Sequence, residues 1–317
     1  MHTILVTGAD GFAGEHLCGR LAARNHRVIG IGLRALPPPR GWQYAILDML
    51  DADRLNTLVA EVRPDLVFHM AAIASTQIAE RSLRHAARLN TLTVVDLMHS
   101  CAAAAPGCRV CIFSTGEVYG PNTNAAHPHT EETPFADPRN FYTATKIAQE
   151  SYARILARNL GLALVIIRPF SMTGPGQGEN FVLGSWAAQV ARIKRGVVAP
   201  EIRVGDLEVY RDFTDVRDAM RGAALLAELE VPAGSTAVYN IASGRAYHLA
   251  GLLGTLTAMA GRPVAVTLDP SRMRAADYPV FVGSAAKIQV ACGWRPEIPI
   301  ERTLAEMVET CQRNITG

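Results

Sequence analysis

The chain has 317 residues, of which 49% are hydrophobic, and its formal net charge at pH 7 is +2. A chain of this size can bury a large core, and its near-neutral charge with scattered basic residues argues against a nucleic-acid partner. No run reaches the roughly 20 apolar residues that a membrane span needs, and the first residues suggest a strand and turn rather than a signal peptide. We therefore expect a cytoplasmic protein with no membrane association.

Six cysteines in a chain of this length do not suggest a disulfide framework. Cys108 and Cys111 form a CxxC within the alternating apolar run "CRVCIFS". An offset of three residues in a strand puts the two sulfurs on opposite faces, where one metal ion cannot bind both. We expect buried reduced thiols and no metal site.

The first half of the chain alternates short β-branched runs with stretches of helical period. The sequence predicts strands near 3–8, 27–33, 65–72, 109–115 and 163–169, and helices near 13–25, 52–62, 83–103 and 141–161. Strands that are hydrophobic on both faces and alternate with helices indicate a parallel sheet covered on both sides. The expected fold class is therefore α/β, a Rossmann-type doubly wound parallel sheet.

After Pro169 the pattern becomes less regular. The sequence predicts a loop at "TGPGQGENF", short strands at "EIRVG" and "AVYNIA", and helices near 181–195, 248–260 and 300–313. We expect an NAD(P)-binding Rossmann domain over 1–170 and a smaller α/β, mainly substrate-binding domain over 171–317, with the chain crossing between them. The crevice between the two parts is where a ligand is expected.

The stretch "ILVTGADGFAGEHL" indicates a dinucleotide site. Gly8 permits a tight turn, Gly11 lets the backbone approach a diphosphate, and Gly14 allows close packing of helix on strand. A GxxGxxG alone occurs by chance, but its position at the first strand-helix junction makes the cofactor interpretation much the stronger one.

The end of the second predicted strand bears on the choice of cofactor. NAD-dependent proteins usually have a carboxylate there for the adenosine ribose, whereas this chain has "IGLR". Arg34 could pair with a 2′-phosphate, which favours NADP. NAD remains possible, with Arg34 as a solvated loop residue.

The segment "FYTATK" contains a candidate acid-base pair. Tyr142 and Lys146 are four residues apart on one face of a predicted helix. A neighbouring cation stabilises a phenolate and lowers its pKa toward neutrality, so Tyr142 could exchange a proton with a carbinol oxygen during hydride transfer.

With these motifs, the chain resembles the extended short-chain dehydrogenase/reductases of nucleotide sugars, the NAD-dependent epimerase/dehydratase group, from end to end. The resemblance is carried by "TGADGFAG", "HMAA", "STGEVYG", "YTATK", "RPF", "RDFTDVRD" and "YNIASG". It implies a catalytic hydroxyl at Thr115, beside Tyr142. It also implies a wider set of cofactor-binding residues: Phe12, Ala13, Asp48, Met49, Met70, Ala71, Ala72, Asn90, Tyr142, Lys146, Pro169 and Phe170.

Within this family, the later segments are most similar to the branch of GDP-mannose 4,6-dehydratases and GDP-4-keto-6-deoxy-mannose reductases. The resemblance implies that Arg211 and Arg274 bind the nucleotide diphosphate. It implies substrate contacts for Ser171, Asn180 and Lys194. The family usually has "RPFN", and the serine at position 171 has a shorter reach than asparagine.

Glu117 in "STGEVYG" is the residue on which the expected reaction depends. A 4-keto reductase needs NADPH and the pair of Tyr142 and Thr115. A 4,6-dehydratase also needs a base that removes the C5 proton of the sugar. Glu117 occupies the position of that base in the resembling dehydratases. Position 116 is glycine, so a second acid is absent there, and the chain lacks the insertion that GDP-mannose dehydratases use in assembly. We favour the reductase; a GDP-mannose-type dehydratase and a 4-epimerase with bound NAD(P) remain alternatives.

Two further expectations concern the protein as a whole. A catalytically idle sugar-nucleotide sensor could lose Thr115, Tyr142 or Lys146, and this chain keeps all three, which favours an enzyme. The helices near 83–103 and 142–158 pair across a dimer in related enzymes, and their alanine-rich faces allow close packing. A homodimer is therefore expected.

Overall fold

A computed structural model of the chain describes residues 1–37, 41–273 and 278–315. Its central feature is a sheet of seven parallel strands in the order β11-β6-β5-β4-β1-β2-β3. The strands are β1 (Thr3–Thr7), β2 (Arg27–Gly32), β3 (Gln43–Ile46), β4 (Leu66–His69), β5 (Arg109–Phe113), β6 (Ala163–Pro169) and β11 (Thr236–Ile241). This order, with β1 in the interior of the sheet, confirms the expected doubly wound fold.

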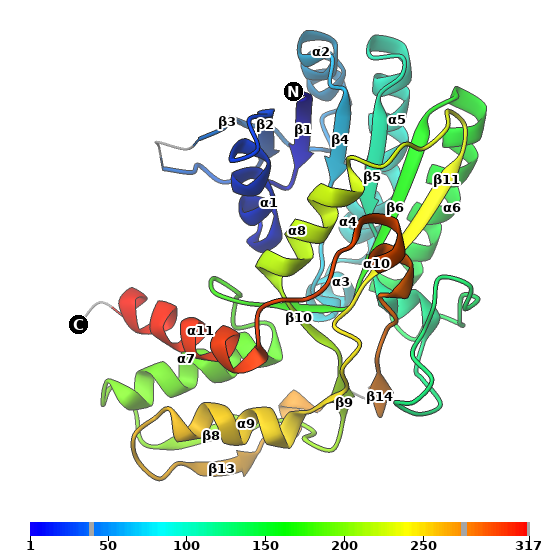
Figure 1. Cartoon of the computed structure of the whole chain (residues 1–317). Coiled ribbons are helices and arrows are strands. Elements are labelled where there is room, and N and C mark those ends of the chain that lie inside the picture. The colour runs from blue at the N-terminus through cyan, green and yellow to red at the C-terminus, as the bar shows by residue number, and fades with distance from the viewer. Residues whose placement is uncertain (38–40, 274–277, 316–317) are drawn as a thin grey trace.

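Helices cover both faces of this sheet (Figure 1). One face packs against α1 (Phe12–Ala22), α8 (Val216–Leu226) and α10 (Ala286–Cys292). The other face packs against α2 (Ala52–Val62), α5 (Thr93–Ala104) and α6 (Phe141–Leu160). Because the inner strands of the sheet are buried on both sides, their side chains alternate between two separate cores.

The CxxC pair follows this alternation. Cys111 packs in the core under α1, and Cys108 packs in the core under α5, on the opposite side of the sheet. The six cysteines are all free thiols. The prediction that the two sulfurs lie on opposite faces is confirmed.

A smaller portion lies beyond the carboxyl ends of the main strands (Figure 1). Its helices are α7 (Val182–Lys194), α9 (Leu249–Ala258) and α11 (Ile300–Asn314), which enclose a third core around Trp186 and Leu304. Its strands form three small sheets: β7 (Ser171–Thr173) with β10 (Phe213–Asp215), β8 (Glu201–Val204) with β13 (Ala265–Leu268), and β9 (Tyr210–Arg211) between β12 (Tyr247–His248) and β14 (Val280–Phe281).

The chain passes more than once between the two portions. After β7 it forms α7 in the smaller portion, returns to the main sheet as α8 and β11, and later returns again as α10. Strand β11 pairs in parallel with β6 along its whole length, from Thr236 opposite Leu164 to Ile241 opposite Pro169. The sequence predicts the strand at "AVYNIA" but not its place in the main sheet. The division at residue 170 stays a prediction.

The helix expected over 83–103 is interrupted. It consists of α4 (Leu83–Ala87), a π-helical turn η1 (Arg88–Leu92) and α5. The short elements α3 (Thr76–Arg81), η2 (Gly116–Tyr119) and η3 (Pro270–Arg272) complete the described chain. A π turn inserts one residue into the helical repeat and is often found at functional sites.

Across the described ranges, no helix is both long and apolar enough to cross a membrane. Within the same ranges, no three histidine, cysteine or acidic side chains are grouped as metal ligands.

Candidate active site

The first strand-helix junction forms the glycine-rich loop at the carboxyl end of β1. Gly8 adopts a φ of +69°, in the left-handed region that favours glycine. A Cβ at Gly14 would lie 2.1 Å from the Gly8 carbonyl oxygen, so α1 approaches the loop closely only because position 14 is glycine. These two positions have the geometry that the sequence predicts for a dinucleotide loop.

The amino end of α1 is open to an anion. Gly11 is the N-cap, and no side chain caps this end within the part of the chain that the structure describes. The first helical hydrogen bond to the cap runs from Glu15 N to Gly11 O, at 3.2 Å. The N–H groups of Phe12, Ala13 and Gly14 therefore lack helical partners and, with the helix dipole, fit the diphosphate of a dinucleotide.

A second turn, at the carboxyl end of β4, lies directly against this loop. The N–H groups of Met70 and Ala71 each donate to Thr7 Oγ1 at 3.1 Å. A Cβ at Gly8 would lie 2.8 Å from Ala71 N, so the two turns are in contact. Met70 and Ala71 are thus positioned next to the glycine loop, and the cofactor contacts that the resemblance implies for them and for Ala72 stay predictions.

His69 holds the contact between these two turns through the Thr7 hydroxyl, a role that the sequence analysis missed. Thr7 Oγ1 already accepts two hydrogen bonds, so its own proton must go to His69 Nδ1, 2.9 Å away. His69 Nε2 then carries the ring proton and donates to Thr93 Oγ1 at 3.3 Å, because the Thr93 hydroxyl donates to a helix carbonyl at 2.7 Å. Burial and the nearby Lys146 lower the pKa of His69 to about 3, so the ring is neutral.

Asn90 lies in the π turn η1 and is fully buried. Its Oδ1 accepts from Ile73 N at 2.8 Å, and its Nδ2 donates to Ile73 O at 3.2 Å and to Thr145 Oγ1 at 3.0 Å. Asn90 therefore joins the loop after β4 to α6 beside Lys146. Its side-chain amide already makes hydrogen bonds to other described residues through both its oxygen and its nitrogen. That Asn90 lies near the cofactor stays a prediction.

The predicted adenosine contacts lie around the carboxyl ends of β2 and β3. Arg34 is in contact with Asp10 of the glycine loop, since Arg34 Nε lies 3.5 Å from Asp10 Oδ2. Asp48 is exposed and accepts from Leu50 N at 2.9 Å, whereas the Met49 side chain is buried in the core under α2. Only the backbone of Met49 is left for a ligand.

Thr115 and Tyr142 come together at the carboxyl end of β5. Thr115 Oγ1 accepts from Glu117 N at 3.2 Å and is hydrogen-bonded to the Tyr142 hydroxyl. Burial, followed by the nearby Glu117 carboxylate, raises the pKa of Tyr142 above its usual value, and the Thr115 hydrogen bond opposes this effect. The expected lowering of the pKa of Tyr142 is therefore wrong.

Lys146 offers Tyr142 less positive charge than the sequence analysis assumed. Its buried ammonium donates to Phe113 O at 2.7 Å and to Gln149 Oε1 at 3.1 Å. Burial lowers the pKa of Lys146 to about 7, and Glu150 opposes this effect. The charge that the sequence analysis assigned to phenolate stabilisation is thus weakened by desolvation.

Glu117 is held at the start of α6. Its Oε2 accepts from Asn140 Nδ2 at 3.2 Å and from Thr143 Oγ1 at 3.0 Å, while Asn140 Oδ1 caps the helix by accepting from Thr143 N at 2.8 Å. A carboxylate at a helix amino end is also favoured by the helix dipole. The arrangement serves to position α6, and with it Tyr142.

The glycine at position 116 has a steric reason. A Cβ there would lie 2.8 to 3.0 Å from the ring of Phe170, which follows Pro169 at the end of β6. Phe170 is buried and stacks on Phe281 with ring centroids 4.6 Å apart. A second acid at position 116 is therefore incompatible with this packing.

The predicted substrate residues are spread more widely. Ser171 begins β7 beside Phe170, and Asn180 is exposed in the loop before α7. Lys194 is exposed at the far end of α7, roughly 18 Å along the helix axis from its first residue. The structure brings Ser171 to the end of the main sheet but does not bring Lys194 there.

Arg211 lies in β9 and is only partly exposed. Its Nη1 donates to Tyr210 O at 2.8 Å and also to Tyr278 O. Arg274 lies outside the described residues.

Asp212, the neighbour of Arg211, organises three chain segments and was missed by the sequence analysis. Its fully buried carboxylate accepts from Ser243 N and Ser243 Oγ, both at 2.7 Å, from Gly244 N at 2.9 Å and from Gly283 N at 3.2 Å. Burial raises the pKa of Asp212 to about 6, against the effect of these donors. In the sequence, Asp212 stands directly between Arg211 and the apolar Phe213, and this position is the signal that could have indicated a buried structural carboxylate.

A buried ion pair behind the site was also missed. Arg168 of "RPF" donates to both oxygens of Glu150, at 2.8 and 2.7 Å, and its Nη1 donates to the Tyr119 hydroxyl at 2.8 Å. Tyr119 in turn donates to Asn240 Oδ1 at 2.8 Å. This network joins α6 to β6, β11 and the "STGEVYG" segment.

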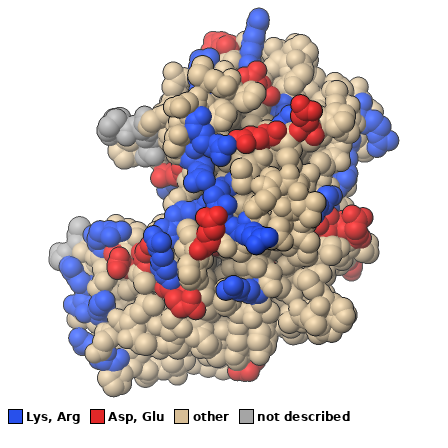
Figure 2. All heavy atoms as spheres, viewed as in Figure 1, with Lys and Arg blue, Asp and Glu red and all other residues tan. Residues whose placement is uncertain are grey.

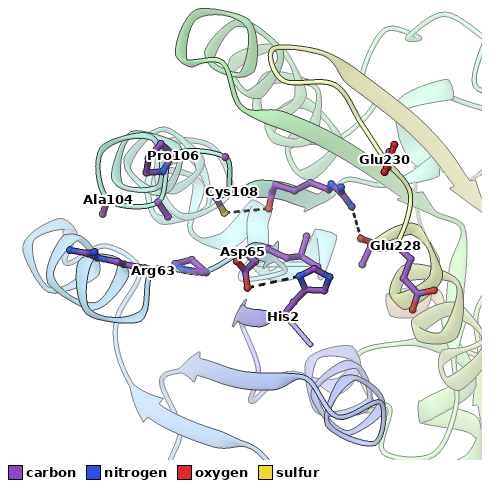
Figure 3. Close-up of a pocket in the computed structure, with 14 residues that line it drawn as sticks. His2, Arg63, Asp65, Ala104, Pro106, Cys108, Glu228 and Glu230 are labelled. Carbon is purple, nitrogen blue, oxygen red and sulfur yellow. Dashed lines mark hydrogen bonds and ion pairs between the residues drawn. The ribbon is translucent and has the colours of Figure 1, made fainter.

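A cavity of about 690 Å³ lies at the amino ends of the parallel strands, where β4 and β5 begin (Figure 3). Its wall includes Arg63, Asp65, Cys108 and Glu228. None of the predicted site residues lines it, because they follow the carboxyl ends of the same strands. We assign no role to this cavity.

Comparison with known proteins places this geometry in context. Residues 4–242 match the model of the NAD dependent epimerase/dehydratase family. The chain is 34% identical, over 98% of each chain, to a GDP-6-deoxy-D-mannose reductase of Pseudomonas aeruginosa. It is also 27% identical, over 96% of this chain and 97% of the relative, to a UDP-glucose 4-epimerase of Mycolicibacterium smegmatis.

Solved structures similar to this chain also include a reductase and an epimerase. The structure of RMD from Pseudomonas aeruginosa complexed with NADPH superimposes with a TM-score of 0.85 at 33% identity, covering 99% of this chain and all of that one. The UDP-glucose 4-epimerase of Thermotoga maritima with UDP-glucose has a TM-score of 0.85 at 26% identity, covering 98% of each chain.

Proposed function

Because the chain belongs to the NAD dependent epimerase/dehydratase family, we propose that it reduces the 4-keto group of a nucleotide-activated 6-deoxyhexose of the GDP-4-keto-6-deoxy-mannose type. Its similarity to a GDP-6-deoxy-D-mannose reductase over 98% of both chains supports this choice. The observation that carries it is this similarity over the full length of both chains, and in the structure Glu117 Oε2 accepts from Asn140 and Thr143 at the start of α6.

In this proposal, Tyr142 gives a proton to the C4 oxygen, and Thr115 donates a hydrogen bond to the same oxygen. When bound, NADPH supplies the hydride for C4. The phenol of Tyr142 is protonated at neutral pH and so has a proton to give, although its raised pKa also makes it a weaker acid. Lys146 retains one ammonium proton beyond its two protein partners for a ribose hydroxyl of the cofactor.

In this proposal, the nucleotide part of the substrate binds to residues of the smaller portion. Arg211 and Arg274 would bind the diphosphate, and Ser171 and Asn180 would line the sugar cleft. Lys194 is the weakest candidate, because it lies at the far end of α7. Anionic and cationic side chains are interspersed on the face shown in Figure 2, which suits a compact charged ligand better than a long polyanion.

We propose NADPH as the preferred cofactor, with NADH as the alternative. A related structure contains NADPH, and in this sequence Arg34 follows the carboxyl end of β2. The open end of α1 and the close contact of Gly14 with Gly8 fit either dinucleotide.

The alternative function is dehydration or epimerisation of a nucleotide sugar. Glu117 favours a dehydratase, since it lies beside Tyr142 and raises its pKa. The similarity to UDP-glucose 4-epimerases favours an epimerase.

Purified protein should oxidise NADPH when it is given a GDP-4-keto-6-deoxyhexose. Tyr142→Phe should lower kcat by about 100-fold or more, because the proton donor is lost, and should leave NADPH binding unchanged. Absorbance of the reduced nicotinamide measures the first, and fluorescence titration measures the second. Conversion of GDP-mannose to a 4-keto product without added reductant would show that the reductase assignment is wrong.

We further propose a homodimer in a reducing, cytoplasmic compartment. Exposed apolar side chains on η1, α4 and α6 support the dimer: Leu83 is 46%, Leu92 49%, Tyr152 42% and Ile155 53% exposed. The six free cysteines support the compartment.

A further inference from the structure

Asp10, in the glycine-rich loop, places its carboxylate at the carboxyl end of β2. Its Oδ2 accepts from Leu33 N at 3.1 Å and from Arg34 N at 2.9 Å. A Cβ at Gly32 would lie 2.1 Å from Asp10 Oδ1, so the carboxylate can lie over the end of β2 only because residue 32 is glycine. The turn after β2 is therefore built around a carboxylate that comes from another strand.

The same carboxylate holds the side chain of Arg34. Arg34 Nε lies 3.5 Å from Asp10 Oδ2, and Arg34 Nη2 donates to the backbone carbonyl of Asp10. The Asp10 side chain is 13% exposed and the Arg34 side chain 70% exposed. An incoming phosphate thus meets a guanidinium that already has an anionic partner.

In doubly wound folds, the adenosine ribose lies at the end of the second strand. A carboxylate there accepts from the 2′-hydroxyl of NAD, whereas an arginine accommodates the 2′-phosphate of NADP. This chain has both groups at that place, in contact with each other. Within the described residues, all side-chain hydrogen bonds of the Asp10 carboxylate are to Oδ2, which leaves Oδ1 for a ribose hydroxyl.

We propose that Asp10 sets the preference between the two dinucleotides. Its carboxylate accepts a hydrogen bond from the 2′-hydroxyl of NADH, and it restrains Arg34, which must be shared with the 2′-phosphate of NADPH. This inference rests on the dinucleotide site of the proposed function. It identifies Asp10, within the glycine motif, as the residue of that site that distinguishes NADPH from NADH.

The physical reason is competition between two anions for one guanidinium. A phosphate ester carries a charge of about −1.5 to −2 at neutral pH, so the Asp10 carboxylate repels it while neutralising Arg34. Removing the charge of Asp10 should therefore strengthen NADPH binding. It should weaken NADH binding, because the ionised acceptor for the 2′-hydroxyl is lost.

Asp10→Asn tests this inference, because asparagine has the same shape and its carbonyl oxygen can still accept from the two backbone amides. We expect the ratio of NADPH affinity to NADH affinity to rise by at least about fivefold. Both affinities are measured by fluorescence or calorimetric titration without any sugar. Asp51→Asn is the matched control, since it removes the same charge at the cap of α2, where asparagine also caps well.

Arg34→Ala should weaken NADPH binding alone, and in its background Asp10→Asn should have a smaller effect on NADPH. An unchanged ratio, a ratio that moves toward NADH, or an equal loss of both cofactors in Asp10→Asn would overturn the inference. Failure of the wild-type protein to bind either dinucleotide would overturn the inference together with the cofactor site. Intact binding without ketone reduction would contradict only the proposed function.

Discussion

His69 shows how a single buried residue can couple the cofactor loop to the pH dependence of stability. The folded protein holds His69 neutral, with a pKa lowered to about 3 from an ordinary value of 6.5, mainly because the ring is buried. The unfolded chain takes up a proton on this ring near pH 6.5. As the pH falls from 6.5 toward 3, the unfolded state is therefore stabilised, and the free energy of unfolding decreases by up to ~1.4 kcal/mol per pH unit.

His69→Asn should remove this dependence while keeping an acceptor for the Thr7 hydroxyl. The variant should be less stable than the wild type at neutral pH, and the difference should shrink below about pH 6. Urea unfolding between about pH 7 and about pH 5 measures both curves, and all other titrating groups cancel in the difference. Parallel curves would show that His69 can be protonated in the folded protein.

Sequence motifs located several residues of the site, but not their partners. Gly8 and Gly14 follow from the order of strand and turn residues, whereas Thr115 was implied by the family resemblance. The contact between Arg34 and Asp10 was not predicted, because it joins residues 24 positions apart through the ends of two neighbouring strands. The raised pKa of Tyr142 was not predicted either, because burial decides it.

At the scale of elements, α6 is the helix that carries the proposed catalytic pair, Tyr142 and Lys146, and Glu117 accepts hydrogen bonds from Asn140 and Thr143 at its amino end. Glu117→Gln keeps one acceptor for Asn140 or Thr143 and should retain ketone reduction within about threefold. Glu117→Ala leaves both donors without their acceptor, so it should lower the free energy of unfolding by ~1–3 kcal/mol and lower kcat. Steady-state kinetics and urea unfolding measure these effects.

Glu132→Gln serves as the control, because it makes the same charge change at an exposed position of the loop before α6. If Glu117→Gln abolishes reduction as completely as Tyr142→Phe, then Glu117 takes part in proton transfer.

The long helix expected over 83–103 illustrates what periodicity misses. Apolar spacing predicts the helix as one piece, whereas the structure contains the π turn η1 within it. The side chain of Asn90 makes three hydrogen bonds, to Ile73 and to Thr145. These partners come from other segments, so local sequence carries no signal of the turn.

At the scale of the whole molecule, the proposed dimer should depend on the exposed apolar face of η1 and α6. Leu92→Glu combined with Ile155→Glu should convert a dimer to a monomer, because charges are strongly disfavoured at the centre of an apolar interface. Light scattering coupled to size exclusion should then give half the wild-type mass. Val290→Glu is the control, since Val290 is 88% exposed on α10, across the sheet. A monomeric wild-type protein would contradict the dimer.

The sequence alone determined the doubly wound sheet and the glycine loop, and it supplied the predicted catalytic residues. These features depend on local periodicity and on motifs whose members are close in the chain. Only the tertiary structure decided that β11 completes the main sheet, that Asp10 is paired with Arg34, that His69 is neutral and that Glu117 supports α6. Each of these depends on which distant groups share a buried space, where desolvation and hydrogen-bond partners set the charge of a side chain.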